Sequence, residues 1–154
     1  MFNAVLESVT DTKIHHPITG LTNDSRKIEK GDLYIALNGI NFDGHDFLSE
    51  VYKKRASAAI VSKINQDLDL QQIKVSNTLD FLKRISNTWR KNFEIPVIAI
   101  TGSNGKTSSK ELLLHILSSI LSVHATKGNF NTCIGLCFSI LELSSEHDLA
   151  IFEL

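Results

Sequence analysis

Cysteine is scarce in this 154-residue sequence, and the two that occur do not form a recognisable metal or disulfide pattern. Cys133 and Cys137 lie four positions apart, with no second pair and no flanking histidine cluster. Zinc sites and disulfide frameworks need more such residues at defined spacings. We therefore expect core-facing thiols on one helix.

Net charge and long apolar runs are also lacking. A formal net charge of −1 and sparse aromatic residues give no global attraction for nucleic acid. No apolar run approaches the roughly 20 residues that span a bilayer, and the N-terminus lacks the features of a signal peptide. With 42% hydrophobic and 21% charged residues, the composition fits a soluble globular protein. We expect a cytoplasmic protein without a nucleic-acid or membrane partner.

The most informative stretch is a glycine-containing loop between an apolar run and a helical pattern. Its glycines allow the backbone to curl closely around an anion, and amide groups at the helix start can point at phosphate oxygens. Lys106 can reach the terminal phosphates, and the Thr107 hydroxyl can ligate Mg²⁺. The stretch predicts a nucleoside triphosphate site, formed by Thr101, Gly102, Ser103, Asn104, Gly105, Lys106, Thr107 and Ser108.

The spacing of this loop differs from the general phosphate-loop pattern. Ile100 stands where the pattern has its first glycine, so Gly102 precedes Gly105 by only three positions. A plain strand-to-helix turn of an α/β protein is the alternative interpretation. Because the Gly-Lys-Thr sequence stands right at the helix start, where the motif needs it, we favour the phosphate site.

The sequence predicts an α/β fold in two parts joined by a helix. Residues 1–76 contain strand-length runs at 32–37, 58–62 and 72–76, with a helix at 45–55. Residues 77–94 form a connecting helix, capped by Asn77 or Thr78, with Leu79, Leu82, Ile85 and Trp89 as its buried stripe. We expect a small N-terminal domain followed by a phosphate-loop domain with a parallel sheet.

Residues 95–154 alternate strands and helices. The expected order is a strand at 97–100 buried on both faces, a helix at 106–121, a strand at 123–126, a helix at 131–143 and a strand at 149–153. Six apolar positions of the first helix form a wide stripe suited to a sheet face. This βαβαβ order begins a doubly wound parallel sheet, and we expect the strand at 123–126 to lie next to the strand at 97–100.

Polar residues at the predicted strand ends form three further clusters. Asn129 and Asn131 could donate to phosphate or position a metal-bound water, and Glu153 is the natural acidic partner for Mg²⁺. Asp24, Ser25 and Arg26 offer either anion recognition or only a solvated turn with an Asx-type hydrogen bond. A loop that contains Asn38, Gly39, Asp43, Gly44 and His45 is a common place for a ligand, although His45 could simply neighbour a helix N-cap.

Taken in order, these segments resemble the Mur ligases of bacterial cell-wall synthesis. The resemblance rests on residues 24–26, 31–32, 36–39, 43–47, 101–107, 128–131, 134–135 and 152–153. Their order and spacing cover nearly the whole chain, and the short phosphate loop is itself typical of this family. Gly128–Gly135 and the Lys110-Glu111 pair most resemble members that add D-alanyl-D-alanine to UDP-N-acetylmuramoyl-tripeptide.

The resemblance implies an ATP-dependent amide ligase that works through an acyl phosphate. Lys106, Asn129 and Asn131 would act on the transferring phosphoryl group, and Thr107 and Glu153 would hold Mg²⁺. The UDP moiety would bind to Asp24, Ser25, Arg26, Asn38, Gly39, Asp43, Gly44 and His45. The family's remaining catalytic residues would lie beyond residue 154, so we expect a monomeric N-terminal fragment that turns over no substrate alone.

Three alternatives remain open at this point. A Mur ligase that adds the third amino acid of the peptide is the nearest, although it usually has a Ser/Thr-Pro-rich stretch that is absent here. A folylpolyglutamate synthetase would lack the segment from Asp24 to Phe47. A non-catalytic module that binds UDP or another nucleotide is the alternative from a different functional class.

Overall fold

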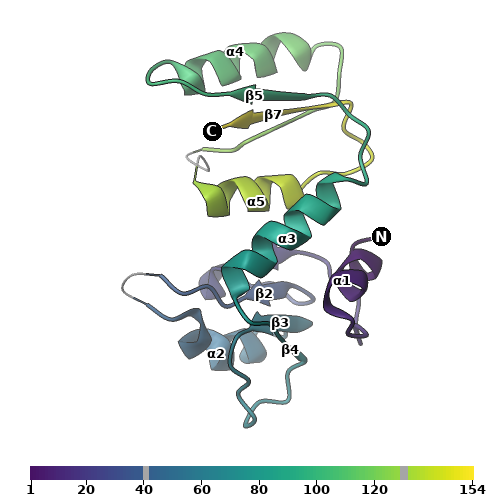
Figure 1. The fold of residues 1–154 in the computed structure, drawn as a ribbon, viewed down its shortest axis with the longest axis vertical. Coiled ribbons are helices and arrows are strands. Elements are labelled where there is room, and N and C mark those ends of the chain that lie inside the picture. The colour runs from purple at the N-terminus through teal and green to yellow at the C-terminus, as the bar shows by residue number, and fades with distance from the viewer. Residues whose placement is uncertain (40–41, 129–131) are drawn as a thin grey trace. The chain divides into compact units, whose positions relative to one another are not determined.

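The computed structural model describes residues 1–39, 42–128 and 132–154, which divide into two compact units (Figure 1). Unit 1 comprises Met1–Ile85 and unit 2 comprises Ser86–Leu154. The boundary falls inside α3 (Thr78–Arg90), so this helix contributes residues to both units. No helix of the described residues is long and apolar enough to cross a bilayer.

Unit 1 is built on a four-stranded parallel sheet. Its strands, β1 (Leu21–Thr22), β2 (Leu33–Ile35), β3 (Ala58–Val61) and β4 (Gln72–Lys74), are ordered β1-β2-β3-β4. The three predicted strands are confirmed in slightly shorter form, and β1 was not predicted. The predicted helix at 45–55 is a 3₁₀ turn, η2 (Gly44–Phe47), that continues into α2 (Leu48–Lys53).

Both faces of this sheet are buried. Tyr34 and Ala59 alternate with Leu33 and Ile60 along the strands, and all four are at most 1% exposed. Because successive side chains of a strand point to opposite faces, such continuous burial requires cover on both sides. On one face Tyr34, Ala36, Ala59 and Val61 form a core cluster with Leu48 and Val51 of α2.

Two helices complete unit 1. α1 (Phe2–Thr10) was not predicted; it buries Leu6 and has no side-chain hydrogen bond at its N-cap. α3 begins after Asn77, whose Oδ1 accepts hydrogen bonds from the amides of Leu79 at 2.9 Å and Asp80 at 3.0 Å. The predicted cap is therefore confirmed as Asn77. Of the predicted stripe, Leu82, Ile85 and Trp89 are buried, and Leu79 is half-buried.

Unit 2 has a three-stranded parallel sheet with helices on opposite faces. Its elements are β5 (Val97–Ile100), α4 (Lys106–Leu117), β6 (Val123–Ala125), α5 (Cys133–Leu141) and β7 (Leu149–Glu153), as predicted in kind and sequence. The strand order is β5-β7-β6. The connection from β5 to β6 through α4 and the connection from β6 back to β7 through α5 run in opposite directions across the sheet. Because both connections are right-handed, α4 and α5 lie on opposite faces (Figure 1).

The order corrects one expectation about strand neighbours. β6 does not lie beside β5, because β7 inserts between them and pairs with both, Ile100 opposite Glu153 and Ala125 opposite Ile151. Every residue of β7 is buried, as expected for a central strand with helices on both faces. The last strand of the chain is therefore the one that lies next to the phosphate-loop strand.

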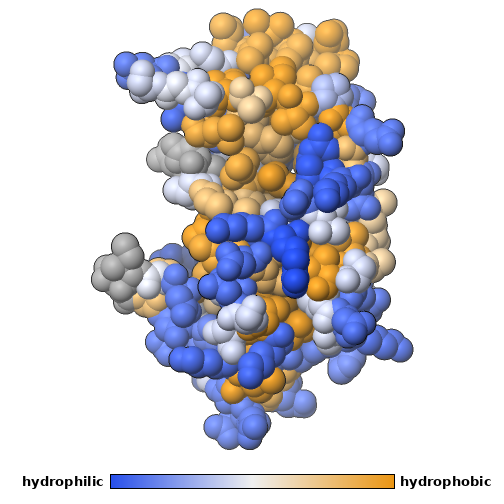
Figure 2. Space-filling model, in the orientation of Figure 1, coloured by the Kyte–Doolittle hydropathy of each residue, from blue (hydrophilic) through white to orange (hydrophobic). Residues whose placement is uncertain are grey.

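Burial in unit 2 departs from three further expectations. β5 is not buried on both faces, since Val97 is 42% exposed at the sheet edge. α4 ends at Leu117 rather than at residue 121, and its predicted apolar stripe is largely open. Leu112 and Ile116 are 60% and 54% exposed, and apolar surface gathers over α4 in Figure 2. Of the two cysteines on α5, Cys137 is buried as expected, but Cys133 is exposed.

A matched pair of isoleucines tests the core of unit 1. Ile60→Ala removes a fully buried side chain from the centre of β3 and should destabilise the unit by about 2–5 kcal/mol through lost burial and a residual cavity. Ile64→Ala, at a position that is 51% exposed, should change the free energy of unfolding by less than about 0.5 kcal/mol. Urea unfolding measures both, and equal effects would contradict the assigned core.

Candidate phosphate and substrate sites

The phosphate loop encloses a small hollow at the carboxyl end of β5. The hollow has a volume of about 260 Å³ and is lined by Ser103, Asn104, Gly105, Lys106, Thr107, Ser108 and Glu153. Six of these seven residues belong to the predicted loop, and the seventh is the predicted acidic partner. Unit 2 therefore brings the loop and the end of β7 together, as the sequence indicated.

The start of α4 is suited to an anion. Gly105 is its N-cap and has φ 74°, in the left-handed region that glycine adopts at little cost. A Cβ at this position would meet no atom within 4 Å, so backbone conformation rather than space selects glycine. The first turn contains Lys106 and no acidic residue. Its amide groups and the positive end of the helix dipole thus face the hollow, and the first turn itself contributes no carboxylate.

Thr107 and Glu153 form the central contact of this hollow. The Thr107 hydroxyl lies 2.9 Å from Oε1 and 3.1 Å from Oε2 of Glu153, so it donates to the carboxylate. Glu153 is only 3% exposed, yet its carboxylate lines the hollow. A hydroxyl and a carboxylate are the hard oxygen ligands that Mg²⁺ prefers next to phosphates. The donor set therefore fits a magnesium ion.

The ends of β6 and β7 complete this edge of the sheet. The Leu154 amide donates to the Ile100 carbonyl at 2.9 Å, which fixes the end of β7 beside the loop strand. Thr126, directly after β6, is buried, and its hydroxyl accepts from the Glu153 amide at 3.2 Å. The predicted catalytic residues Asn129 and Asn131 lie outside the described residues.

In unit 1, the Asp24–Arg26 turn is tied together by its own side chains. Arg26 donates through Nε and Nη2 to the two carboxylate oxygens of Asp24, both at 2.8 Å, and its amide donates to Asp24 Oδ1 at 3.1 Å. The Asx-type hydrogen bond of the plainer interpretation is therefore present. The Arg26 side chain is nevertheless 84% exposed, so a solvent-facing part of the guanidinium is accessible to an anion.

Ser25 points inward, and its contacts anchor the turn to α2. Its hydroxyl donates to Glu50 Oε2 at 2.8 Å, and Lys54 Nζ donates to the Ser25 and Arg26 carbonyls, both at 2.9 Å. The hydrogen bond from Ser25, and then Lys54, lowers the pKa of Glu50. The Arg26 guanidinium holds the pKa of Asp24 down, at about 2. Ionised carboxylates therefore organise this turn.

The loop after β2 is anchored by His45. Its Nε2 accepts the Ser62 amide at 2.9 Å, so Nδ1 carries the proton and donates to Asp43 Oδ1 at 2.5 Å. Asp43 also caps η2 by accepting the His45 amide at 2.9 Å, and these hydrogen bonds lower its pKa. Asn38 and Gly39 are exposed on the same loop. His45 thus connects the loop to the end of β3.

Gly44 is required in this loop by close packing. A Cβ there would lie 2.6 Å from the Leu37 carbonyl oxygen, a backbone atom that cannot move aside cheaply. The Gly44 carbonyl accepts from the buried Tyr34 hydroxyl at 3.0 Å, and burial raises the pKa of Tyr34 to about 12. The described substrate residues of the prediction therefore lie in the two segments that follow β1 and β2.

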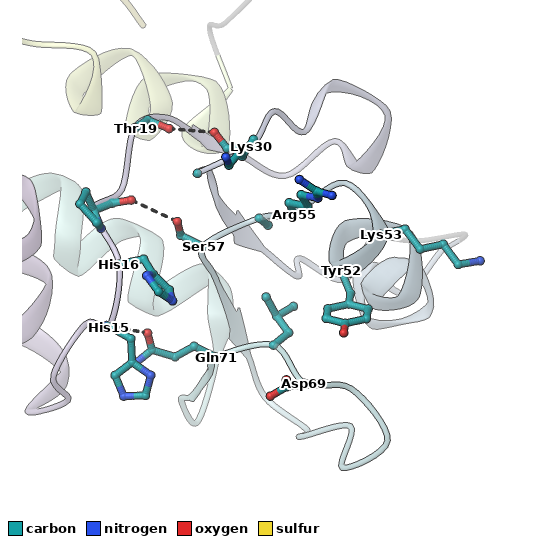
Figure 3. A pocket seen from close by; sticks show the side chains of 14 residues that line it. His15, His16, Thr19, Lys30, Tyr52, Lys53, Arg55, Ser57, Asp69 and Gln71 are labelled. Carbon is teal, nitrogen blue, oxygen red and sulfur yellow. Dashed lines mark hydrogen bonds between the residues drawn. The ribbon is translucent and has the colours of Figure 1, made fainter.

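A wider cleft in unit 1 contains none of these predicted residues. It has a volume of about 860 Å³, with His15 and His16 on one side and Tyr52 and Asp69 on the other (Figure 3). Gly31, Ser57 and Gln71, which stand just before β2, β3 and β4, also line it. The cleft is thus at the amino ends of the strands, whereas ligands of open α/β sheets bind at the carboxyl ends.

Sequence reasoning missed several residues that hold these sites. Glu50 and Ser62 anchor loops that are distant from them in the sequence, and no local sequence pattern marks either residue. Lys110 is buried beside Glu153, but the sequence pointed to it only because the Lys110-Glu111 pair resembles one group of Mur ligases. Its position, four residues after Lys106, was an available signal, because residues four apart share a helix face.

Two family models match the chain in order. "Mur ligase family, catalytic domain" matches residues 17–90, and "Mur ligase middle domain" matches residues 100–154. A Synechocystis protein named UDP-N-acetylmuramoyl-tripeptide–D-alanyl-D-alanine ligase is 39% identical over 151 residues, which are 97% of this chain and 33% of the relative. The chain therefore spans about a third of the length of the curated relatives it matches.

Solved structures agree with these matches. MurF from Acinetobacter baumannii superposes with a TM-score of 0.92 at 34% identity, covering 99% of this chain and 35% of that one. MurF ligase from Thermotoga maritima, in complex with ADP, gives a TM-score of 0.78 at 32% identity over 91% of this chain and 32% of that one. The two family models, the curated relatives and the solved structures agree over nearly the whole chain, and the chain belongs to the Mur ligase family.

Proposed function

We propose that this chain provides the substrate-binding and ATP-binding parts of a ligase that joins D-alanyl-D-alanine to UDP-N-acetylmuramoyl-tripeptide. Relatives that are 38–42% identical over most of its length bear the name of that activity. The observation that carries the proposal is the hydroxyl–carboxylate pair of Thr107 and Glu153 at the mouth of the phosphate loop. The reaction would make peptidoglycan precursor in the cytoplasm, with the protein acting as a monomer.

In this proposal unit 2 binds ATP. The amides of residues 102–108 and the start of α4 would hold the phosphates, and Lys106 would offset the negative charge of the transferring group. Thr107 and Glu153 would hold Mg²⁺, which neutralises phosphate charge when bound. Asn129 and Asn131 follow β6 in the sequence and are proposed to contact the same phosphoryl group.

Unit 1 is proposed to bind the UDP moiety. Arg26 offers an exposed guanidinium next to a turn, while Asn38 and Gly39 are exposed on the neighbouring loop. Asp43, Gly44 and His45 would shape that loop, because Asp43 Oδ1, the Gly44 carbonyl and the His45 ring nitrogens bind protein atoms. Asp24 and Ser25 would likewise hold the turn that presents Arg26.

The chemistry of the proposed reaction needs a carboxylate, a phosphoryl donor and an amine. The tripeptide carboxylate attacks the γ-phosphoryl group of ATP, which gives an acyl phosphate and ADP. The amine of D-alanyl-D-alanine then attacks the acyl carbon, and phosphate leaves as the amide forms. Since the chain spans about a third of its relatives, we propose that it binds both nucleotides but forms no amide by itself.

Replacement of the phosphate-loop lysine tests the ATP site. Lys106→Met should weaken ATP binding in Mg²⁺ about 10–100-fold, since a hydrogen bond to a charged group contributes about 1.5–3 kcal/mol. Lys91→Met removes the same charge from an exposed position of unit 2 and should leave the affinity unchanged. Isothermal titration calorimetry measures both, and equal affinities of the two variants would contradict the assignment.

A second pair of variants tests the UDP site. Arg26→Ala should weaken binding of UDP-N-acetylmuramoyl-tripeptide about tenfold, because a charge-assisted contact to the diphosphate is lost. Lys27→Ala, at the adjacent exposed lysine, is the matched control and should bind as the unmodified chain does. If the tripeptide nucleotide bound Arg26→Ala with full affinity while ATP binding stayed intact, unit 1 would bind UDP elsewhere.

The turn that presents Arg26 should be sensitive to acid. The pKa of Asp24 is about 2 in the folded chain, below its ordinary value of 3.8, so its stabilising effect is present above about pH 4 and lost as pH falls toward 2. Thermal unfolding between pH 5 and pH 2 should therefore show a shallower pH dependence for Asp24→Asn than for the unmodified chain. The exposed Asp67→Asn is the control, and identical slopes for both variants would exclude this role of Asp24.

A further inference from the structure

A fully buried lysine lies directly behind the proposed magnesium site. Lys110 is 1% exposed and is located on α4, one turn after Lys106. It does not belong to the phosphate loop and does not line the hollow formed by that loop. Lysine is almost never fully buried unless it is paired, so its partners indicate why the charge is there.

Lys110 joins three backbone segments through its ammonium group. Nζ donates to the Thr126 carbonyl at 2.7 Å, lies 3.0 Å from Glu111 Oε1 and lies 3.9 Å from Glu153 Oε2. Of the two carboxylates, Glu111 is largely exposed and Glu153 is buried. Water screens the Glu111 contact, whereas the Lys110–Glu153 pair interacts at low dielectric, where the attraction between charges is stronger.

The partners of Lys110 are themselves linked. The Thr126 hydroxyl accepts from the Glu153 amide, and the Thr126 amide donates to the Ile151 carbonyl at 3.0 Å. The Glu153 carboxylate lies near two residues of α4: its Oε2 is 3.9 Å from Lys110 Nζ, and both of its oxygens are within 3.1 Å of the Thr107 hydroxyl. Replacement of Lys110 would therefore alter the surroundings of the Glu153 carboxylate directly, and also through Thr126 at the end of β6.

We propose that Lys110 is a positioning residue that orients the Glu153 carboxylate for Mg²⁺ bound with nucleotide. This inference rests on the proposed function, because it assigns Glu153 to the metal. Side chains behind a metal ligand orient it, and their loss typically lowers metal affinity or activity about 10–100-fold. Lys110 also compensates the charge of a carboxylate that is nearly excluded from water.

The effect should appear in the magnesium-dependent part of nucleotide binding. The ratio of the ADP dissociation constants without and with Mg²⁺ measures how much the metal contributes. In Lys110→Met this ratio should fall about tenfold, while ADP affinity in EDTA, which depends on the loop amides and Lys106, should change less than about twofold. In a Glu153→Gln background the same substitution should leave the ratio unchanged, because the group that it orients is altered.

Three controls distinguish an effect on the orientation of Glu153 from a loss of folding and from a general loss of positive charge. Lys110→Gln keeps a polar N–H donor on a side chain one bond shorter but has no charge, and it should also lower the ratio. Lys91→Met is the exposed charge control and should keep the full ratio. A circular-dichroism melt of each variant checks that the chain is folded.

The outcomes distinguish this inference from the proposed function. If the unmodified chain binds ADP without any magnesium dependence, the assignment of Glu153 fails and this inference fails with it. If the unmodified chain shows the dependence but Lys110→Met retains it, only this inference is overturned. A parallel loss of affinity with and without Mg²⁺, or loss of the thermal transition in both Lys110 variants, would make Lys110 a purely structural residue.

Discussion

The hydrogen bonds between the Thr107 hydroxyl and the Glu153 carboxylate join the first turn of α4 to the end of β7. The two residues are 46 positions apart, and the contact exists only because β7 inserts beside β5. That pairing places Glu153 opposite Ile100, next to the strand that leads into the phosphate loop. The strand order of unit 2 thus determines whether a carboxylate reaches the hollow at all.

The sequence predicted features that depend on neighbouring residues. The phosphate loop was predictable because its glycines, Lys106 and Thr107 are consecutive, and the Asn77 cap because it directly precedes its helix. The position of β7 between β5 and β6 was not predictable, since local patterns do not specify which strands pair. α1 was missed because no side chain caps its start, although Leu6 is buried. Composition also overstated the burial of β5, because burial depends on what covers a strand.

In the proposed substrate loops, too, the sequence predicted local features but not the long-range contacts. The sequence located Asp24, Arg26 and His45 near strand ends, but it left open whether they bind a ligand or hold a turn. Each has protein partners: Arg26 binds Asp24, and His45 connects Asp43 to the Ser62 amide. Such partners do not exclude a ligand at Arg26, whose side chain is largely exposed, and they show that the largely buried His45 side chain supports its loop. Long-range partners such as Glu50 decide between these roles, and spacing alone does not reveal them.

Thr107 and Glu153 are the proposed protein ligands of a divalent cation that unit 2 would bind with nucleotide. Anomalous scattering from crystals grown with ADP and Mn²⁺, a substitute for Mg²⁺ that scatters strongly, measures the ion position directly. We expect a single strong peak in the hollow beside the loop, within about 2–4 Å of Thr107 Oγ1 and the Glu153 carboxylate, with the ion bound directly or through one water. A peak distant from both side chains, with ADP phosphates still bound at the loop, would contradict it.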